Sequence, residues 1–176
     1  MDGMGQSVAL VHNFLKDLAW SEKAGDEPFW NAIYHKAFPN MVSAMSCPGD
    51  FASQRMGIDR VILLSNGETI KIDEKKRRED RGDILLEYIS NDVTDAPGWI
   101  EKDLAIQYLA YAFIPSRRCY LFDWPMLRRA WLKFKDGWIS RGPFIAAQNN
   151  GYKTISTAVP TKELLSAVSS ARIIQL

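Results

Sequence analysis

The sequence predicts an α/β fold in which a mixed central β-sheet is flanked by helices. Three apolar runs with the character of strands follow one another at 58–64, 69–76 and 84–89. Segments with helical spacing of apolar residues lie before and after them, and a further apolar run at 119–122 requires a crossover connection. A length of 176 residues fits one domain, 1–176, with a core at 28–123 and additions at 124–176.

Two helices are expected before the first strand. Ser7 can cap a helix whose apolar face is formed by Val8, Val11, Leu15 and Leu18. Pro28 stands at the start of a second helix, with Phe29, Trp30, Ile33, Tyr34 and Ala37 on one face. The segment 40–56 has no clear period and contains Pro48-Gly49-Asp50, which indicates a loop.

The first two strands are joined by Asn66-Gly67, the strongest short hairpin signal a sequence offers. A charged segment, 77–83, separates the second strand from the third. We then expect a helix over 101–113, a strand at 119–122, a helix opened by Asp123 and Pro125, a strand over 152–159 and a helix over 161–169.

Composition places few limits on function. The net charge is +1, but residues 1–100 carry 11 basic and 16 acidic side chains, whereas residues 101–176 carry 11 and 5. An acidic first half is suited to a metal and a basic second half to phosphates. Two distant cysteines, no signal-peptide pattern and no spanning apolar segment favour a cytoplasmic protein that is not bound to a membrane.

The hairpin brings charged residues together. Asp59 folds back towards Asp73-Glu74-Lys75, and carboxylates with a lysine can hold a divalent cation and polarise a water. A strict two-residue loop would put Asp59 opposite Glu74 and place Lys76 on the same face. A bulge or kink would instead select Asp73 and Lys75, which is the arrangement we favour.

An acid at the start of one core strand and D/E-x-K in the next, within an αβββαβ order over residues 28–123, resembles the PD-(D/E)xK phosphodiesterase superfamily, which has the restriction-endonuclease-like fold. The resemblance implies Mg²⁺ or Mn²⁺ as cofactor and DNA as partner. It implies catalytic roles for Asp59, Asp73 and Lys75, and metal ligation by Asp59, Asp73, Glu74 and Glu87. Glu27, Gln107 and Lys76 are supporting candidates.

Basic residues interleaved with tryptophans form a candidate nucleic-acid surface in the second half, namely Arg117, Arg118, Arg128, Arg129, Lys133 and Lys135. Trp124, Trp131 and Trp138 stand at helical spacing, which favours core packing for them. The sequence therefore predicts a metal-dependent nuclease acting on DNA, as a homodimer or within a larger complex. Its alternatives are an inactive binding module of the same fold and an unrelated α+β interaction protein.

Overall fold

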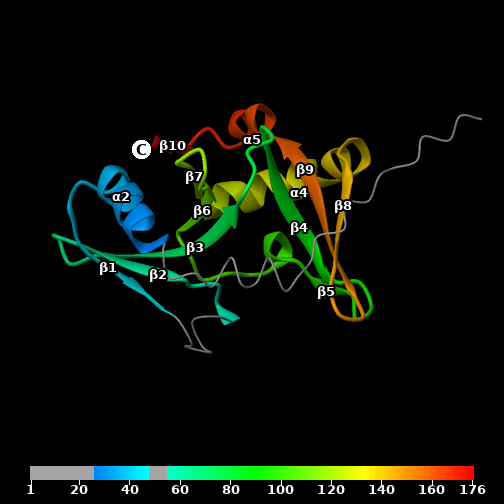
Figure 1. Cartoon of the computed structure of the whole chain (residues 1–176), viewed down its shortest axis with the longest axis horizontal. Helices are drawn as coiled ribbons and strands as arrows, with labels where there is room; N and C mark the ends of the chain where they lie inside the picture. The colour runs from blue at the N-terminus through cyan, green and yellow to red at the C-terminus, as the bar shows by residue number, and fades with distance from the viewer. Residues whose placement is uncertain (1–25, 48–54) are drawn as a thin grey trace, which may run out of the picture.

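The computed structural model describes residues 26–47 and 55–176, which form a mixed α/β structure dominated by strands (Figure 1). The helix expected from Ser7 and the turn at Pro48-Gly49-Asp50 lie outside these residues. No helix of the described part is long and apolar enough to cross a membrane.

A six-stranded mixed sheet contains the β2–β3 hairpin and draws strands from both halves of the chain. Its order is β1 (Met41–Ser46), β2 (Arg60–Leu64), β3 (Thr69–Arg77), β6 (Tyr108–Phe113), β7 (Arg118–Asp123) and β10 (Arg172–Gln175). Only the β3–β6 pair is parallel, and the other pairs are antiparallel. The predicted mixed sheet is therefore confirmed.

A second, antiparallel sheet has the order β5 (Ala96–Pro97), β4 (Asp83–Asn91), β9 (Lys153–Pro160) and β8 (Phe144–Gln148). Three helices complete the described fold: α2 (Glu27–Ala37), α4 (Trp124–Arg141) and α5 (Thr161–Ala167), together with the 3-10 turn η2 (Trp99–Glu101). The helices expected at Pro28, at Asp123 and over 161–169 are confirmed. Pro125 occupies the first turn of α4, where the Asp123 carboxylate accepts a hydrogen bond from the Met126 N–H at 3.0 Å.

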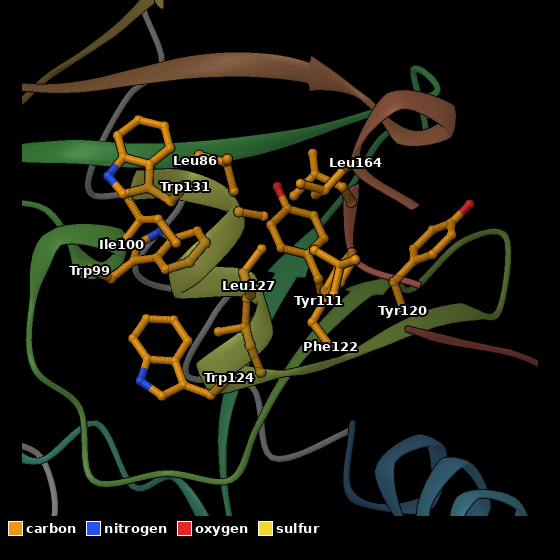
Figure 2. Close-up of a cluster of buried hydrophobic side chains, with 14 of the residues drawn as sticks. Leu86, Trp99, Ile100, Tyr111, Tyr120, Phe122, Trp124, Leu127, Trp131 and Leu164 are labelled. Carbon is orange, nitrogen blue, oxygen red and sulfur yellow. The ribbon is translucent and has the colours of Figure 1, made fainter. Parts of the chain in front are cut away.

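Two apolar cores lie on the two faces of the six-stranded sheet. α2 covers one face, where Ile33 and Tyr34 pack against Ile62 and Ile72. On the other face, Leu109, Tyr111 and Phe113 of β6 meet α4 and the four-stranded sheet. Figure 2 shows the aromatic side chains of η2, β6, β7 and α4 gathered in this second core. The three tryptophans of α4 are buried, as their spacing predicted.

Three predictions about the elements are wrong. The expected loop contains strand β1 over 41–46. The helix expected over 101–113 is instead an extended segment leading into β6, which is buried on both faces, so that its continuous apolar run mimics a buried helix. The third predicted strand, β4, does not join β3, because β6 occupies that edge of β3, and β4 pairs with β9 in the other sheet.

Candidate active site

The site begins where β2 enters the six-stranded sheet. Arg60 of β2 lies opposite Ile72 of β3, and Asp59 directly precedes this last pair of the ladder. The regular pairing ends there: the Asp59 N–H donates at 3.0 Å to the carbonyl of Ile72, the residue already opposite Arg60, as in a β-bulge. Asp73 and Lys75 are alternate residues of β3, so they project to the same face of the sheet. Asp59 lies beside this face, since Asp59, Asp73 and Lys75 line one pocket and Asp59 affects the pKa of Asp73.

This register results from a three-residue loop rather than a two-residue one. Leu63 pairs with Thr69, and the Leu64 N–H donates to the Glu68 carbonyl at 2.9 Å, leaving Ser65-Asn66-Gly67 as the loop. Gly67 has φ +84°, the left-handed conformation that such a loop requires at its last position. Of the two arrangements left open by the sequence, the favoured one, with Asp73 and Lys75 beside Asp59, is the one observed.

Asp73 is a buried carboxylate whose negative charge and hydrogen-bond acceptors are only partly satisfied by its neighbours. Its side chain is 3% exposed, and its Oδ1 accepts from Lys75 Nζ at 2.5 Å. Its Oδ2 is buried and has no hydrogen-bond partner among the described residues. Burial raises the pKa of Asp73 to about 7, and the neighbouring Asp59 adds to the increase although Lys75 opposes it. Asp73 is therefore a buried carboxyl group whose charged form Lys75 stabilises only in part.

Lys75 keeps its proton in this environment. Burial by itself lowers its pKa, but the carboxylates of Asp73, Asp59 and Glu87 outweigh that effect and raise the pKa above its usual value. Its side chain is 30% exposed, so the ammonium group remains accessible from the pocket. Lys75 consequently acts as a fixed positive charge and hydrogen-bond donor beside the two carboxylates.

Glu74 and Lys76, which alternate with Asp73 and Lys75 along β3, project from the opposite face of the sheet. Glu74 Oε1 accepts from Tyr34 Oη at 2.8 Å and from Arg60 Nε at 2.9 Å. Arg60, 1% exposed, also forms two hydrogen bonds with Glu27, at 2.8 and 3.0 Å. Lys76 Nζ donates to Asp26 Oδ2 at 2.8 Å. The side chains of Glu74 and Lys76 therefore lie on the α2 side of the sheet, where Glu27 of α2 binds Arg60, and all three are away from Asp59 and Asp73.

Glu74 still contributes to the site through its backbone. Its N–H donates to Asp59 Oδ2 at 2.8 Å and so fixes the orientation of the Asp59 carboxylate. Gln107, which was expected on a helix, lies immediately before β6. There its Oε1 accepts from the Lys71 N–H at 2.7 Å, so it fastens β3 to the start of β6.

Glu87 approaches the site from the second sheet. Burial raises its pKa, while the charges of Lys75 and Lys102 and a hydrogen bond from the Trp99 N–H oppose the increase. Its charge partners are therefore lysines of the site. Among the described residues no three acidic, histidine or cysteine side chains form a group that could hold a metal, so Glu87 does not complete a three-carboxylate cluster.

A pocket of about 560 Å³ opens over the carboxylates. It is lined by Arg55, Gly57, Asp59, Asp73, Lys75, Trp99, Lys102 and Leu104. Sequence reasoning missed Arg55, which lies in the predicted loop, Lys102, which lies in the helix expected over 101–113, and Trp99, which falls between predicted elements. In the sequence, the glycine two residues before Asp59 was the sign of a sharp turn at this point. In the structure Gly57 has φ +71°, a conformation that favours glycine.

The predicted basic surface is dispersed, and within the described chain none of its six residues lines this pocket. Lys135 contacts Glu101 at 3.0 Å and Arg128 donates to the Ile100 carbonyl, so both hold η2 against α4. Arg118 pairs with Asp80 at 3.0 Å. Arg117 and Arg129 are exposed, and Lys133 Nζ lies 5.0 Å from the centre of the Phe134 ring.

Comparisons of the chain with protein-family models, curated proteins and solved structures found no match. The assignment of function therefore depends on the chemistry of the site itself.

Proposed function

We propose that the protein is a metal-dependent phosphodiester hydrolase acting on DNA, with its reaction centre at Asp59, Asp73 and Lys75. The single observation that carries the proposal is the placement of two adjacent carboxylates and a protonated lysine at the floor of one pocket. The motif shared with the PD-(D/E)xK superfamily adds support, whereas the absence of a helix over 101–113 departs from the expected element order.

Asp59 and Asp73 fit a hard divalent cation. Mg²⁺ and Mn²⁺ are commonly held by one or two carboxylates, with water and substrate oxygens completing the coordination. The unpartnered Asp73 Oδ2 is a buried acceptor open to such a cation. Burial, with a smaller contribution from Asp59, raises the pKa of Asp73, and a cation bound to its carboxylate would favour the charged form. When bound, such a cation lowers the pKa of a coordinated water and stabilises charge on a phosphoryl oxygen.

The side chains of Asp59, Asp73 and Lys75 have separate roles in the proposed reaction. Asp59 is oriented by the Glu74 N–H, and Asp73 is held rigidly within β3 by the parallel pairing with β6. Lys75 carries a proton at Nζ and can donate to a non-bridging oxygen of the scissile phosphate, or to the attacking water. Trp99 and Leu104 supply the apolar part of the pocket lining.

The proposal is tested by incubating supercoiled plasmid and single-stranded DNA with the protein in Mg²⁺, Mn²⁺ or EDTA. We expect nicking or strand cleavage only with a divalent cation. Asp73→Ala and Lys75→Ala should reduce the rate by at least about 100-fold. Lys76→Ala is the matched control, because Lys76 projects to the α2 face and pairs with Asp26. This control should retain activity within a few-fold of the wild type.

Two outcomes would reject the hydrolase. One is the absence of cleavage of every DNA form with either cation. The other is cleavage that persists unchanged in Asp73→Ala, which would indicate a contaminating enzyme. Salt-dependent DNA binding without cleavage would instead identify the protein as a binding module.

A further inference from the structure

The pocket above the carboxylates has a second set of charges at its mouth. Arg55 and Lys102 line the pocket and are exposed, whereas Asp73 lies deep within it and Lys75 is partly covered. Positive charge is therefore present at two depths. The inner lysine is beside the proposed reaction centre, and the outer pair is at the entrance.

The charge of the pocket favours an anion with more than one negative group. Three cationic side chains, of Arg55, Lys75 and Lys102, line the pocket with two carboxylates, and Glu87, behind the lining, also interacts with the two lysines. A divalent cation on the carboxylates would increase the positive charge. One scissile phosphate contacting Lys75 would leave the two outer cations without a substrate group, whereas a strand with several phosphates would satisfy them.

The two outer cations are held on one connected wall. Arg55 precedes Met56, whose carbonyl accepts a hydrogen bond from the Ala105 N–H at 3.0 Å. This contact links the Arg55 segment to the segment that carries Lys102. The wall is therefore formed by two chain segments fastened to each other, rather than by two independent surface residues.

Lys102 is fixed further by the packing of η2 on the second sheet. It directly follows η2, and its N–H donates to the Trp99 carbonyl at 3.3 Å. Glu101, its neighbour, accepts from Trp131 Nε1 at 2.9 Å on α4. At Gly98, an added Cβ would overlap the Glu87 backbone, so η2 approaches β4 as closely as a glycine permits. The backbone that presents Lys102 is consequently restrained from both sides.

We propose that Arg55 and Lys102 bind a phosphate next to the scissile one, so that the substrate is a DNA strand rather than an isolated phosphodiester. This inference rests on the proposed function and adds to it a requirement for flanking phosphates and two specificity-determining residues. Arg55 and Lys102 take no part in the bond-breaking step. Their effect is confined to substrates that extend beyond one phosphodiester.

The test compares two substrates with Arg55→Gln, Lys102→Gln and the double variant. A fluorescent single-stranded oligonucleotide supplies flanking phosphates, and bis(4-nitrophenyl) phosphate supplies a single phosphodiester. For the oligonucleotide we expect kcat/KM to fall about 10-fold per substitution. The slope of log kcat/KM against log salt concentration should become less negative by about one for each residue replaced. Hydrolysis of the small substrate should stay within about twofold of the wild type. Lys153→Gln, an exposed lysine outside the pocket lining, is the matched control.

An equal loss on both substrates, or no loss on the oligonucleotide, would overturn the inference while leaving the hydrolase intact. If the wild type hydrolyses neither substrate with Mg²⁺ or Mn²⁺, the proposed function fails. The inference is then decided by oligonucleotide binding to Asp73→Asn in EDTA, measured by fluorescence anisotropy. Weaker binding and a smaller salt slope after the two glutamine substitutions would support a phosphate subsite, and unchanged binding would refute it.

Discussion

Replacing Asp73 by asparagine should stabilise the protein at neutral to alkaline pH when no divalent cation is present. The side chain is 3% exposed, and one of its oxygens has no partner among the described residues. Burial is the largest cause of its raised pKa, and Asp59 contributes further. Asparagine keeps the shape and an acceptor for Lys75, but it carries no charge that must be desolvated.

The sign and size of the effect follow from the pKa. Asp73 titrates at about 7 in the folded protein, against about 3.9 in an unfolded chain. A raised pKa means that the folded state holds the proton more tightly, so the free energy of unfolding falls as pH rises from about 4 to about 7. A shift of about three units corresponds to an upper limit of about 4 kcal/mol, and relaxation around the charge reduces the expected gain to about 1–3 kcal/mol.

The assay is urea and thermal unfolding in EDTA at several pH values between 4 and 8.5. At pH 8 the variant should melt about 2–12 °C above the wild type, because 1 kcal/mol shifts Tm by about 2–4 °C for a chain of this size. At pH 4 the two curves should nearly coincide. Asp136→Asn, which changes an exposed carboxylate of α4, is the control and should show no such pH-dependent gap. A variant that is less stable at pH 8, or a difference independent of pH, would refute the reasoning.

Three further predictions concern the metal, the α2 face and η2. Mg²⁺ or Mn²⁺ should raise the Tm of the wild type and not that of Asp73→Asn, since binding stabilises the folded state by mass action. Equal shifts in Tm for both proteins, measured by calorimetry, would contradict a site at the carboxylates. Arg60→Ala should cost about 3–5 kcal/mol in urea unfolding, because Glu74, 12% exposed, loses its cation. Arg118→Ala removes a more exposed pair with a cost below about 1 kcal/mol and serves as its control; similar losses for both would argue against a buried ion pair. Gly98→Ala should cost about 2 kcal/mol, because its Cβ would collide with the Glu87 backbone, and an unchanged Tm would disprove this close approach.

The sequence was sufficient for α2, α4 and the β2–β3 hairpin because each has a local signal: an N-terminal proline or an Asn-Gly turn. It was insufficient for β6, whose alternate residues are buried in different cores. A strand buried on both faces shows no polar–apolar alternation, so its run of apolar residues matched a helix equally well. The pocket rim was missed for another reason. Arg55 and Lys102 lie on irregular segments whose positions are set by tertiary contacts such as the Ala105–Met56 hydrogen bond.

The pairing register of the β2–β3 hairpin determines which charged side chains lie together. The positions of the isoleucines in the sequence indicate this register, which turn chemistry alone does not. In the observed register Ile62 lies opposite Ile70, and Ile72 lies on the same face as both. A two-residue loop would have placed Ile62 opposite Lys71 and would have exchanged the isoleucines of β3 for charged residues beneath α2. Such a slip moves a whole set of side chains to the other face, and burial of the isoleucines opposes it. The same packing that fills the core under α2 therefore turns Asp73 and Lys75 towards Asp59, so the apolar residues of β3 determine the composition of the proposed catalytic site.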